Sequence, residues 1–241
     1  MFDAKKESEK IVDFIKTVFK ERPTFKGVIL GMSGGKDSLI CAALCIRALG
    51  ANKVFGVLMP NGEQSDIQDA FETIKHLGIE STVANIGKAY DAMVETIKAT
   101  TGDLSRTTLI NIPSRLRMAT LYAIAQERQL LVCCTSNLSE ATIGYTTKWG
   151  DNIGDFAPIL HLTKTEVVEV GLSLGLPPDL VKKEPADGLS GLTDEQSFGF
   201  SYIELDNYIR GTPQNIPANA LKKIERRISA NMHKRLPIPS L

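Results

Sequence analysis

The sequence of 241 residues lacks an excess of charge of either sign, since Lys and Arg together number 28 and Asp and Glu also number 28. Balanced charge gives no bulk attraction to nucleic acid or to an anionic membrane, so neither partner is expected. No apolar run approaches the roughly 18 residues of a transmembrane helix. The charged start, residues 1–10, lacks the apolar core of a signal peptide. These absences predict a cytoplasmic protein.

The sequence also lacks any Cys-x-x-Cys pair, although it contains four cysteines. Cys41 and Cys45 lie one helical turn apart in an apolar stretch, and Cys133 and Cys134 are adjacent in another. No His lies near either pair at the spacing of a metal ligand. Buried, reduced thiols are therefore expected rather than a zinc or redox site.

Apolar patterns of two kinds alternate along the chain. Short apolar runs typical of buried strands occur at 28–30, 54–59, 80–86 (the weakest) and 130–134. Apolar residues at helical spacing predict helices at 10–20, 39–46, 67–77, 89–99, 113–128, 163–174, 201–209 and 217–232. This alternation predicts an α/β fold, a doubly wound, mostly parallel sheet flanked by helices. The length suits one domain, residues 1–241.

Three segments lack these patterns and are expected to be irregular: 100–112, 137–158 and 182–193. Long irregular loops in compact domains are usually functional. Pro113 suits the first position of a helix, which would place Arg115 and Arg117 in the first helical turn. The helix at 10–20 precedes the first strand, so it is expected to cover the sheet or to pack against another subunit.

Residues 27–38 form the most informative stretch, Gly-Val-Ile-Leu-Gly-Met-Ser-Gly-Gly-Lys-Asp-Ser. A strand, a glycine turn and a helix in this order aim backbone N–H groups and a helix dipole at an anion. Ser33 and Ser38 add hydroxyl groups, and Gly34 and Gly35 allow close approach. Asp37 would repel a phosphate unless a divalent cation lay between them. A glycine-rich turn that binds nothing is the alternative, and a Walker A loop is absent.

The Ser-Gly-Gly-x-Asp-Ser string resembles the signature of the ATP pyrophosphatases, which split ATP into AMP and pyrophosphate. Five further strings follow it in order, at 135–140, 144–151, 162–167, 193–195 and 233–235. Together the six resemble the ammonia-dependent NAD synthetases along the whole chain. The resemblance implies a Rossmann-like fold of the ATP pyrophosphatase type in a single NAD synthetase domain.

That family is a group of ligases that convert deamido-NAD to NAD. ATP activates the nicotinate carboxylate as an acyl-adenylate, pyrophosphate leaves, and ammonia then displaces AMP. The resemblance implies Mg²⁺ with ATP as co-substrate, a homodimer, and free ammonia as the nitrogen donor, because no glutaminase domain fits in this length. No nucleic acid or membrane takes part.

The resemblance also implies roles for individual residues. The ATP contacts are Gly31, Ser33, Gly34, Gly35, Asp37, Ser38, Gln64, Thr135, Lys164 and Thr193. The deamido-NAD contacts are Asn111, Arg115, Arg117, Lys148, Asp155, His233 and Lys234. Asp37 and Glu140 are the expected Mg²⁺ ligands, and Asp37 and Asp151 the catalytic residues, with Asp151 accepting a proton from ammonium.

Each of these residues also has a plainer interpretation. Glu140 could be a carboxylate at a helix start and Thr193 an N-cap. Lys164, early in a helix, could be a solvated surface lysine, although its position against the helix dipole indicates an anion nearby. Asp151 could serve only in a loop turn, and Arg115 and Arg117 could be surface residues.

The chain departs from the family at two places, Leu58, where some members have an arginine, and 185–193, which lacks the usual tryptophan and glutamine. Two rival functions remain open at this level. One is another ATP pyrophosphatase, such as a tRNA-thiolating or GMP-synthesising enzyme, although balanced charge and the lack of Cys-x-x-Cys argue against tRNA thiolation. The other is a non-catalytic nucleotide sensor of similar fold.

Overall fold

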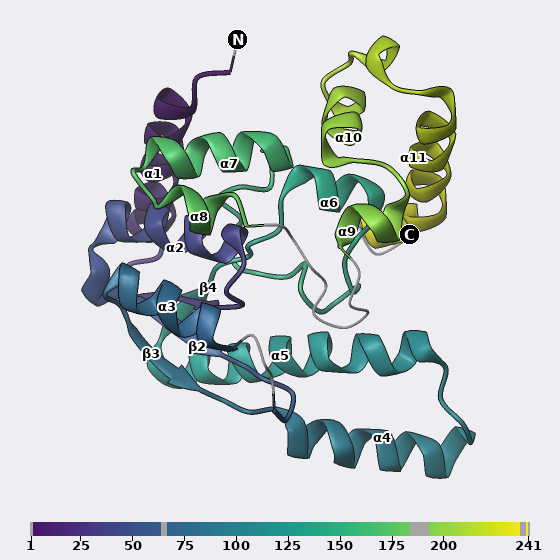
Figure 1. Ribbon diagram of the computed structural model, residues 1–241. Helices are drawn as coiled ribbons and strands as arrows, with labels where there is room; N and C mark the ends of the chain where they lie inside the picture. Colours follow the sequence, from purple (N-terminus) through teal and green to yellow (C-terminus); the bar gives the residue numbers. More distant parts are fainter. Residues whose placement is uncertain (1, 64–66, 184–192, 237–239, 241) are drawn as a thin grey trace.

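The computed structural model describes residues 2–63, 67–183, 193–236 and 240. Its centre is a four-stranded, fully parallel sheet in the order β3-β2-β1-β4 (Figure 1). The strands are β1 (Gly27–Gly31), β2 (Val54–Leu58), β3 (Glu80–Val83) and β4 (Leu130–Val132). The reversal of strand order beside β1 is the mark of a doubly wound sheet, so the predicted α/β fold is confirmed.

Helices cover both faces of the sheet because the strand side chains alternate between them. Val28 and Leu30 face one layer of apolar side chains, whereas Ile29 faces the other. The first face carries α1 (Ala4–Glu21), α2 (Lys36–Leu49), α3 (Ile67–Leu77) and α7 (Lys164–Ser173). The second carries α5 (Arg106–Arg128), on which α4 (Gly87–Thr101) packs (Figure 1).

A second group of helices lies beyond the carboxyl ends of the strands. It comprises α6 (Leu138–Ile143), α9 (Asp194–Phe198), α10 (Tyr202–Ile209) and α11 (Ala218–Asn231). These helices share a separate apolar cluster that includes Phe198, Leu205 and Ile224. The remaining short helices are η1 (Ala51–Lys53), α8 (Pro178–Val181), η2 (Pro213–Asn215) and η3 (Met232–Lys234). These helices therefore flank the edge at which the carboxyl ends of the strands lie.

The expectation that 100–112 is irregular is wrong. Helix α4 continues to Thr101, and α5 begins at Arg106 with the Ser105 side chain accepting a hydrogen bond from the Thr108 amide. Pro113 therefore lies inside a helix, where it forgoes one backbone hydrogen bond. Burial of Ile112 and Pro113 offsets that loss, so tertiary packing outweighs the local signal. As a result, Arg115 and Arg117 lie well inside α5 and not in its first turn.

The structure corrects the expectation for the segment 137–158 and confirms the one for the cysteines. The segment 137–158 is not irregular throughout, because α6 occupies Leu138–Ile143, with the Asn137 side chain capping its N-terminus. All four cysteines are buried free thiols, as predicted.

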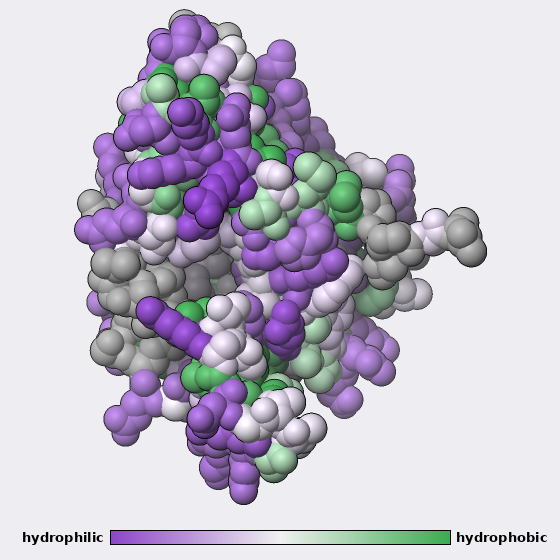
Figure 2. Space-filling model, turned by 90° about the vertical axis from the view of Figure 1, so that its right-hand side faces the viewer, coloured by the Kyte–Doolittle hydropathy of each residue, from purple (hydrophilic) through white to green (hydrophobic). Residues whose placement is uncertain are grey.

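Helix α1 packs against α2 and α7 of the same chain, so it covers the sheet layer. Over the described part of the chain, no helix is both long and apolar enough to cross a bilayer. On the face drawn in Figure 2, hydrophilic residues predominate and the hydrophobic ones form small, interrupted groups.

Candidate functional site

A cavity of about 970 Å³ opens at the carboxyl ends of β1, β2 and β4. Gly31, Ser33 and Thr135 line it from the strand ends, as does the loop that holds Asp151. Side chains of α5 form the opposite wall, among them Arg117. The polar segments after β1 and β4 therefore meet at one edge, as parallel pairing predicts. The predicted contact Gln64 lies outside the described residues.

The turn after β1 is organised by its two serines. Ser33 Oγ accepts a hydrogen bond from the Gly35 amide at 3.2 Å and lies 3.3 Å from Ser38 Oγ, which donates to the Gly35 carbonyl. Gly34 has φ = +78°, a conformation that glycine adopts without strain. Gly35 caps α2 without a side-chain hydrogen bond, so the first amides of α2 remain available to an anion.

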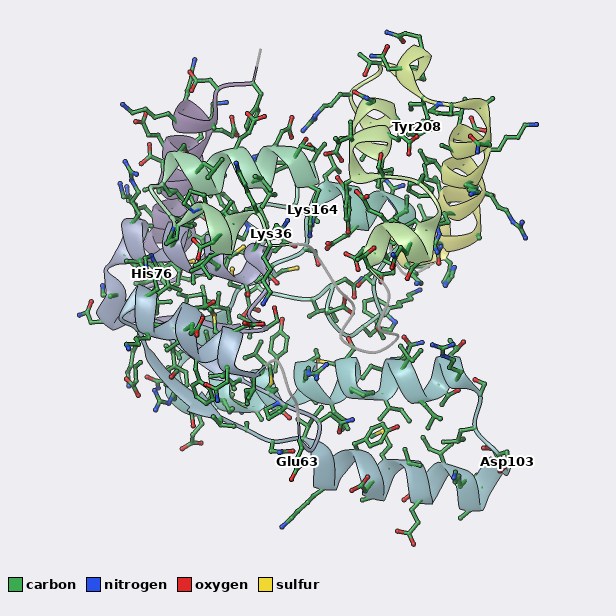
Figure 3. The ribbon with its side chains drawn as sticks, in the orientation of Figure 1. Lys36, Glu63, His76, Asp103, Lys164 and Tyr208 are labelled. Atoms are coloured by element: carbon green, nitrogen blue, oxygen red, sulfur yellow. The ribbon has the colours of Figure 1, made fainter. Side chains whose placement is uncertain are left out.

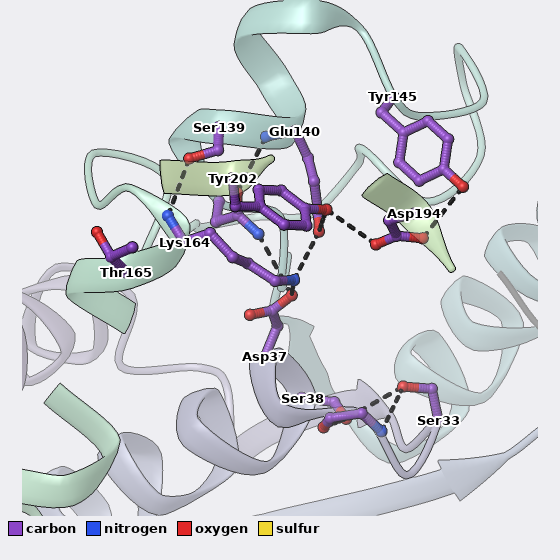
Figure 4. Close-up of polar contacts among 12 residues, drawn as sticks. Ser33, Asp37, Ser38, Ser139, Glu140, Tyr145, Lys164, Thr165, Asp194 and Tyr202 are labelled. Atoms are coloured by element: carbon purple, nitrogen blue, oxygen red, sulfur yellow. Dashed lines mark hydrogen bonds and ion pairs between the residues drawn. The ribbon is translucent and has the colours of Figure 1, made fainter. Parts of the chain in front are cut away.

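Lys164 joins the two carboxylates that the sequence indicated as metal ligands (Figure 4). Its Nζ lies 2.6 Å from Asp37 Oδ2 and 2.8 Å from Glu140 Oε1. Only 6% of the Lys164 side chain is exposed. The anions that the position of Lys164 indicated are therefore Asp37 and Glu140 themselves.

Electrostatics keep this cluster charged. Burial acts to lower the pKa of Lys164, but the charges of Asp37 and Glu140 outweigh it and hold the pKa above its usual value. Burial raises the pKa of Glu140, and the charge of Lys164 acts in the opposite direction. A fixed ammonium between two carboxylates allows both to lie close together before any substrate binds.

The carboxylates also retain capacity for a cation. Asp37 Oδ2 accepts from Lys164 and from Asn137 Nδ2, whereas the buried Asp37 Oδ1 has no hydrogen-bond partner in the described structure. Carboxylate oxygens are the ligands that Mg²⁺ prefers, and proteins usually supply only one or two of them beside substrate phosphates. The chemistry of Asp37 and Glu140 therefore suits a divalent cation whose remaining ligands come from a bound molecule or water.

A tyrosine–aspartate network, absent from the predictions, supports Glu140. Tyr202 donates to Asp194 at 2.8 Å and contacts Glu140 Oε1 at 3.4 Å, and Tyr145 donates to the other Asp194 oxygen (Figure 4). Asp194 follows Thr193, whose side chain caps α9, so Thr193 does act as an N-cap. The string at 193–195 pointed to Asp194, whereas nothing in the sequence singled out Tyr202.

A second buried carboxylate fixes the start of α7. Asp206 accepts from Ser139 Oγ at 2.5 Å and from the Thr165 amide at 2.9 Å, and Ser139 Oγ accepts from the Lys164 amide. Asp206 thus ties α10 to both α6 and α7. The backbone of Lys164 is held by this linkage.

The loop after α6 wraps around Asp151. Its carboxylate accepts from Ser114 Oγ, Thr146 Oγ1 and the Thr147 amide at 2.8–2.9 Å. Thr147 Oγ1 donates in turn to Asn111 Oδ1 at 2.8 Å. Thr147 therefore links Asn111 to Asp151, and of these three residues Thr147 and Asp151 line the cavity.

The two arginines of α5 reach different neighbours. Arg115 Nε donates to the Lys148 carbonyl at 3.3 Å, and Arg117 Nε donates to the Met59 carbonyl at 2.9 Å. Arg117 lines the cavity, whereas Arg115 is exposed and lies beside the loop that carries Lys148.

The C-terminal segment is fastened to that same loop. Lys234 Nζ donates to the Gly144 and Thr146 carbonyls at 2.8 and 2.7 Å, and Lys148 Nζ donates to the His233 carbonyl at 2.8 Å. The predicted contacts Lys148, His233 and Lys234 are therefore neighbours in space.

Asp155 bonds to the sheet. Its Oδ2 accepts from the Val132 amide at 2.7 Å, and its own amide donates to the Val132 carbonyl. The next residue, Phe156, forms a parallel bridge with Cys133. Asp155 therefore lies beside β4, at the edge of the sheet.

Lys36, within the glycine turn motif, is a charged residue that the predictions left out. It is only 9% exposed. Burial, followed by the nearby charge of Lys164, lowers its pKa. Figure 3 labels both lysines near the centre of the molecule, between the sheet and the helices beyond it.

Comparison with known proteins gives consistent results. The sequence model of a family described as NAD synthase matches residues 7–238. The NH(3)-dependent NAD(+) synthetase of Pyrococcus horikoshii is 40% identical over 252 residues, which span 99% of this chain and 95% of that protein. The corresponding synthetase of Thermococcus sibiricus is 39% identical over 250 residues, 98% of this chain and 97% of that protein.

Solved structures show the same likeness in three dimensions. An NMN synthetase from Francisella tularensis has a TM-score of 0.91 at 33% identity, over 100% of this chain and 99% of its own. An NH3-dependent NAD synthetase from Campylobacter jejuni has a TM-score of 0.80 at 28% identity, over 100% of both chains.

Proposed function

Because this chain belongs to the NAD synthase family, we propose that it is an ammonia-dependent ligase that converts deamido-NAD to NAD. The reaction consumes ATP and ammonia and releases AMP and pyrophosphate. The observation that carries the proposal is the convergence of Asp37, Glu140 and Lys164 beside the Ser33–Ser38 turn. Phosphate-binding backbone, cation-binding carboxylates and an ammonium lie together there.

The first step needs ATP held with its α-phosphate open to attack by a carboxylate. The amides at the start of α2, with Ser33 and Ser38, bind phosphate oxygens, and Gly31 and Thr135 border the cavity beside them. Lys164 orients Asp37 and Glu140, which would hold Mg²⁺. When bound, that ion compensates the charge of the departing pyrophosphate.

Both steps need the nicotinate end of the substrate in the same cavity. Arg117 on the cavity wall, with Arg115, Lys148 and Lys234 beyond it, supplies positive charge for the phosphates of deamido-NAD. His233 lies beside Lys148 and is a further proposed contact. Asn111 and Asp155 complete the proposed substrate contacts. Their distribution along α5 and the loop after α6 matches an elongated ligand.

We assign Asp151 to the ammonia step. Its three hydrogen bonds fix the carboxylate at the cavity wall. A fixed carboxylate attracts ammonium and accepts a proton from it, which frees the nitrogen lone pair. The resulting ammonia then attacks the acyl-adenylate carbonyl, and AMP leaves.

A second candidate substrate is nicotinate mononucleotide, the amide product being NMN. The observation that favours it is the TM-score of 0.91 to the Francisella tularensis NMN synthetase, against 0.80 to the Campylobacter jejuni NAD synthetase. The two substrates share the nicotinate carboxylate and differ by an adenylate group. The chemistry of the site serves both.

The test incubates the purified protein with ATP, Mg²⁺ and ammonium, and adds deamido-NAD or nicotinate mononucleotide. The proposal expects one amide and one AMP per ATP consumed. The substrate with the higher kcat/KM, deamido-NAD or nicotinate mononucleotide, is the preferred one. AMP release that ignores both substrates would instead indicate another ATP pyrophosphatase. ATP binding without turnover would indicate a nucleotide sensor. ATP turnover that survives Asp37→Ala would contradict the catalytic role of Asp37.

Three broader proposals accompany this function. We propose a single domain over residues 1–241, a homodimer, and a place in the cytoplasm, where ATP and nicotinate nucleotides are available. Light scattering after size-exclusion chromatography checks the dimer, and limited proteolysis with mass spectrometry checks the single domain. Immunoblotting of fractionated cells checks the location.

A further inference from the structure

Asp194 is a buried carboxylate whose two oxygens accept hydrogen bonds from two phenols. It is 5% exposed; its Oδ2 accepts from Tyr202 at 2.8 Å and its Oδ1 from Tyr145 at 3.2 Å (Figure 4). Burying a carboxylate is costly unless hydrogen bonds compensate for the lost water. An acidic residue in the first turn of a helix interacts with the helix dipole without being buried, as the exposed Asp179 does in α8. The burial of Asp194 therefore indicates a role beyond starting α9.

The Tyr202 hydroxyl lies between two carboxylates that compete for its proton. Its oxygen is 2.8 Å from Asp194 Oδ2 and 3.4 Å from Glu140 Oε1 (Figure 4). Burial, followed by the charges of Glu140 and Asp194, raises the pKa of Tyr202, so the hydroxyl keeps its proton. A phenol has a single proton to donate, and the shorter contact indicates that Asp194 holds it.

Packing fixes the ring of Tyr202 in this position. The residue is 5% exposed, and its ring meets that of Phe198 edge to face with 5.6 Å between the centroids. Lys164 Nζ lies 5.2 Å from the centroid of the Tyr202 ring, within the range of a cation–π interaction. Because these contacts hold the ring, the hydroxyl can change its acceptor only by rotation of the O–H bond.

The choice of acceptor matters for Glu140. Its Oε1 already accepts a hydrogen bond from Lys164 at 2.8 Å. A second hydrogen bond to the same oxygen, from the phenol, would engage a further lone pair and draw charge from the carboxylate. A divalent cation binds through the same lone pairs and the same charge. A phenol that donates to Glu140 would therefore weaken cation binding.

We propose that Asp194 is a positioning residue of the cation site. It retains the Tyr202 proton and so leaves the charge of Glu140 to Lys164 and to a divalent cation. The inference rests on the proposed function only in taking this cation as the one that accompanies ATP. Asp194 acts through Tyr202, and it takes no part in the bonds that the reaction makes or breaks.

A purely structural role for Asp194 leads to a different expectation. If Asp194 only stabilises the fold, removing the Tyr202 hydroxyl from a protein that already lacks the Asp194 carboxylate cannot improve cation binding. If Asp194 acts by retaining the phenol proton, removing that hydroxyl removes the competing donor and restores cation binding. A pair of variants therefore separates the two roles.

The test measures binding of Mn²⁺ alone, from the electron paramagnetic resonance signal of the free ion. Asp194→Ala should raise the Kd about tenfold, because the phenol then donates to Glu140. Tyr202→Phe alone should change the Kd by less than about twofold, and adding it to Asp194→Ala should bring the Kd back to within about threefold of wild type. The control, Asp179→Ala, removes an exposed carboxylate from the first turn of another short helix and should leave the Kd unchanged.

Steady-state kinetics provide the second readout. The Mg²⁺ concentration that gives half the maximal rate should rise in Asp194→Ala and return toward the wild-type value in the double variant. Unchanged Mn²⁺ affinity in Asp194→Ala, a loss that Tyr202→Phe does not relieve, or a wild-type protein that binds no Mn²⁺ would each overturn the inference. If Asp194→Ala fails to fold, Asp194→Leu, which also lacks an acceptor, takes its place in the same comparison.

Mn²⁺ binding can be measured without turnover, which separates this inference from the proposed function. Weakened Mn²⁺ binding that the second substitution relieves, in a protein that amidates neither deamido-NAD nor nicotinate mononucleotide, would leave the inference standing and remove the function. Normal amidation by a protein whose Mn²⁺ affinity is the same in wild type and Asp194→Ala would do the reverse.

Discussion

Lys164 Nζ lies 2.6 Å from Asp37 Oδ2, although 127 residues separate the two in the sequence. The contact joins the first turn of α7 to the first turn of α2 across the carboxyl ends of the strands. Together with the 2.8 Å contact to Glu140, it makes one ammonium responsible for holding two like charges side by side. Removing that ammonium therefore has consequences for both folding and activity.

Lys164→Met should lower the free energy of unfolding by about 3–5 kcal/mol, the cost of leaving buried carboxylates unpaired. It should also abolish measurable ATP turnover, because Asp37 and Glu140 would repel each other and lose their orientation. Urea titration and an AMP-release assay measure the two effects. Lys16→Met, which removes an exposed lysine paired with Asp13, should cost less than about 1 kcal/mol. Similar losses in both variants would contradict this account.

Gly34→Ala should be more harmful than a matched change at Gly78. Both glycines have positive φ, +78° and +62°, so each alanine carries a comparable backbone strain of about 1 kcal/mol. A Cβ at Gly34 would in addition lie 3.0 Å from the Ala70 amide nitrogen, whereas a Cβ at Gly78 meets nothing within 4 Å. Only Gly34→Ala should weaken ATP binding, as measured by calorimetry. Equal ATP affinity in the two variants would show that the turn tolerates the change.

Asp206→Asn should reduce kcat by about tenfold or more without direct contact with substrate. The carboxylate accepts from Ser139 and from the Thr165 amide, and an amide group cannot accept at both positions. The start of α7 would shift, and Lys164 with it. Because Asp206 positions Lys164, the Mg²⁺ dependence of the rate should change as well. The control is Glu225→Gln, on the exposed face of α11, which should change neither kcat nor the Mg²⁺ dependence. If Asp206→Asn is less stable but keeps the normal Mg²⁺ dependence, the positioning role is refuted.

Lys234→Met should loosen the loop at 144–148. Two carbonyl groups, those of Gly144 and Thr146, would lose their shared donor. Hydrogen–deuterium exchange of the loop amides should become faster, and the KM for the nicotinate substrate should rise with little change in the KM for ATP. Lys222→Met on α11 is the control. Unchanged exchange in the loop would mean that other contacts hold it.

The buried thiols predict an alkaline limit to stability. Burial raises the pKa of Cys41 and of Cys133 above the ordinary value of 9.0. The unfolded chain therefore loses these protons first, and the free energy of unfolding should fall as the pH rises through about 9. Each such thiol contributes up to about 1.4 kcal/mol per pH unit, so Cys41→Ala should make the decline shallower by that amount. Iodoacetamide should modify the native protein slowly and the unfolded protein at all four cysteines.

Features fixed by local patterns could be predicted from the sequence. The strands follow from short apolar runs, and the Ser33–Ser38 turn follows from its glycines. The parallel sheet was confirmed, and the segments after β1 and β4 do meet at one edge. The proximity of Asp37 and Glu140 also followed, because both come after strands that pair in parallel. The participation of Lys164 between them could not be derived, since no local pattern connects α7 to that edge.

At the start of α5, the local sequence pattern gives the wrong prediction. The polar residues before Pro113 indicate a loop, and Pro113 indicates a helix start. Burial of Ile112 and Pro113 against the rest of the molecule decides the matter, and this burial is not visible in a window of sequence. Asp194 lay within a string that the sequence singled out, but its partners are Tyr145, in the loop after α6, and Tyr202, in α10. Networks of this kind depend on tertiary packing.

The pairing of Asp155 with Val132 has a consequence for how this protein behaves at high concentration. An edge strand with unpaired backbone groups can form hydrogen bonds with a strand of a second molecule, and natural proteins usually cover or block such edge strands. Here the Asp155 carboxylate and the Phe156 carbonyl occupy backbone donors along the outer side of β4. Replacing Asp155 with Ala would expose the Val132 amide, so the variant should aggregate more readily than its loss of thermal stability alone would explain.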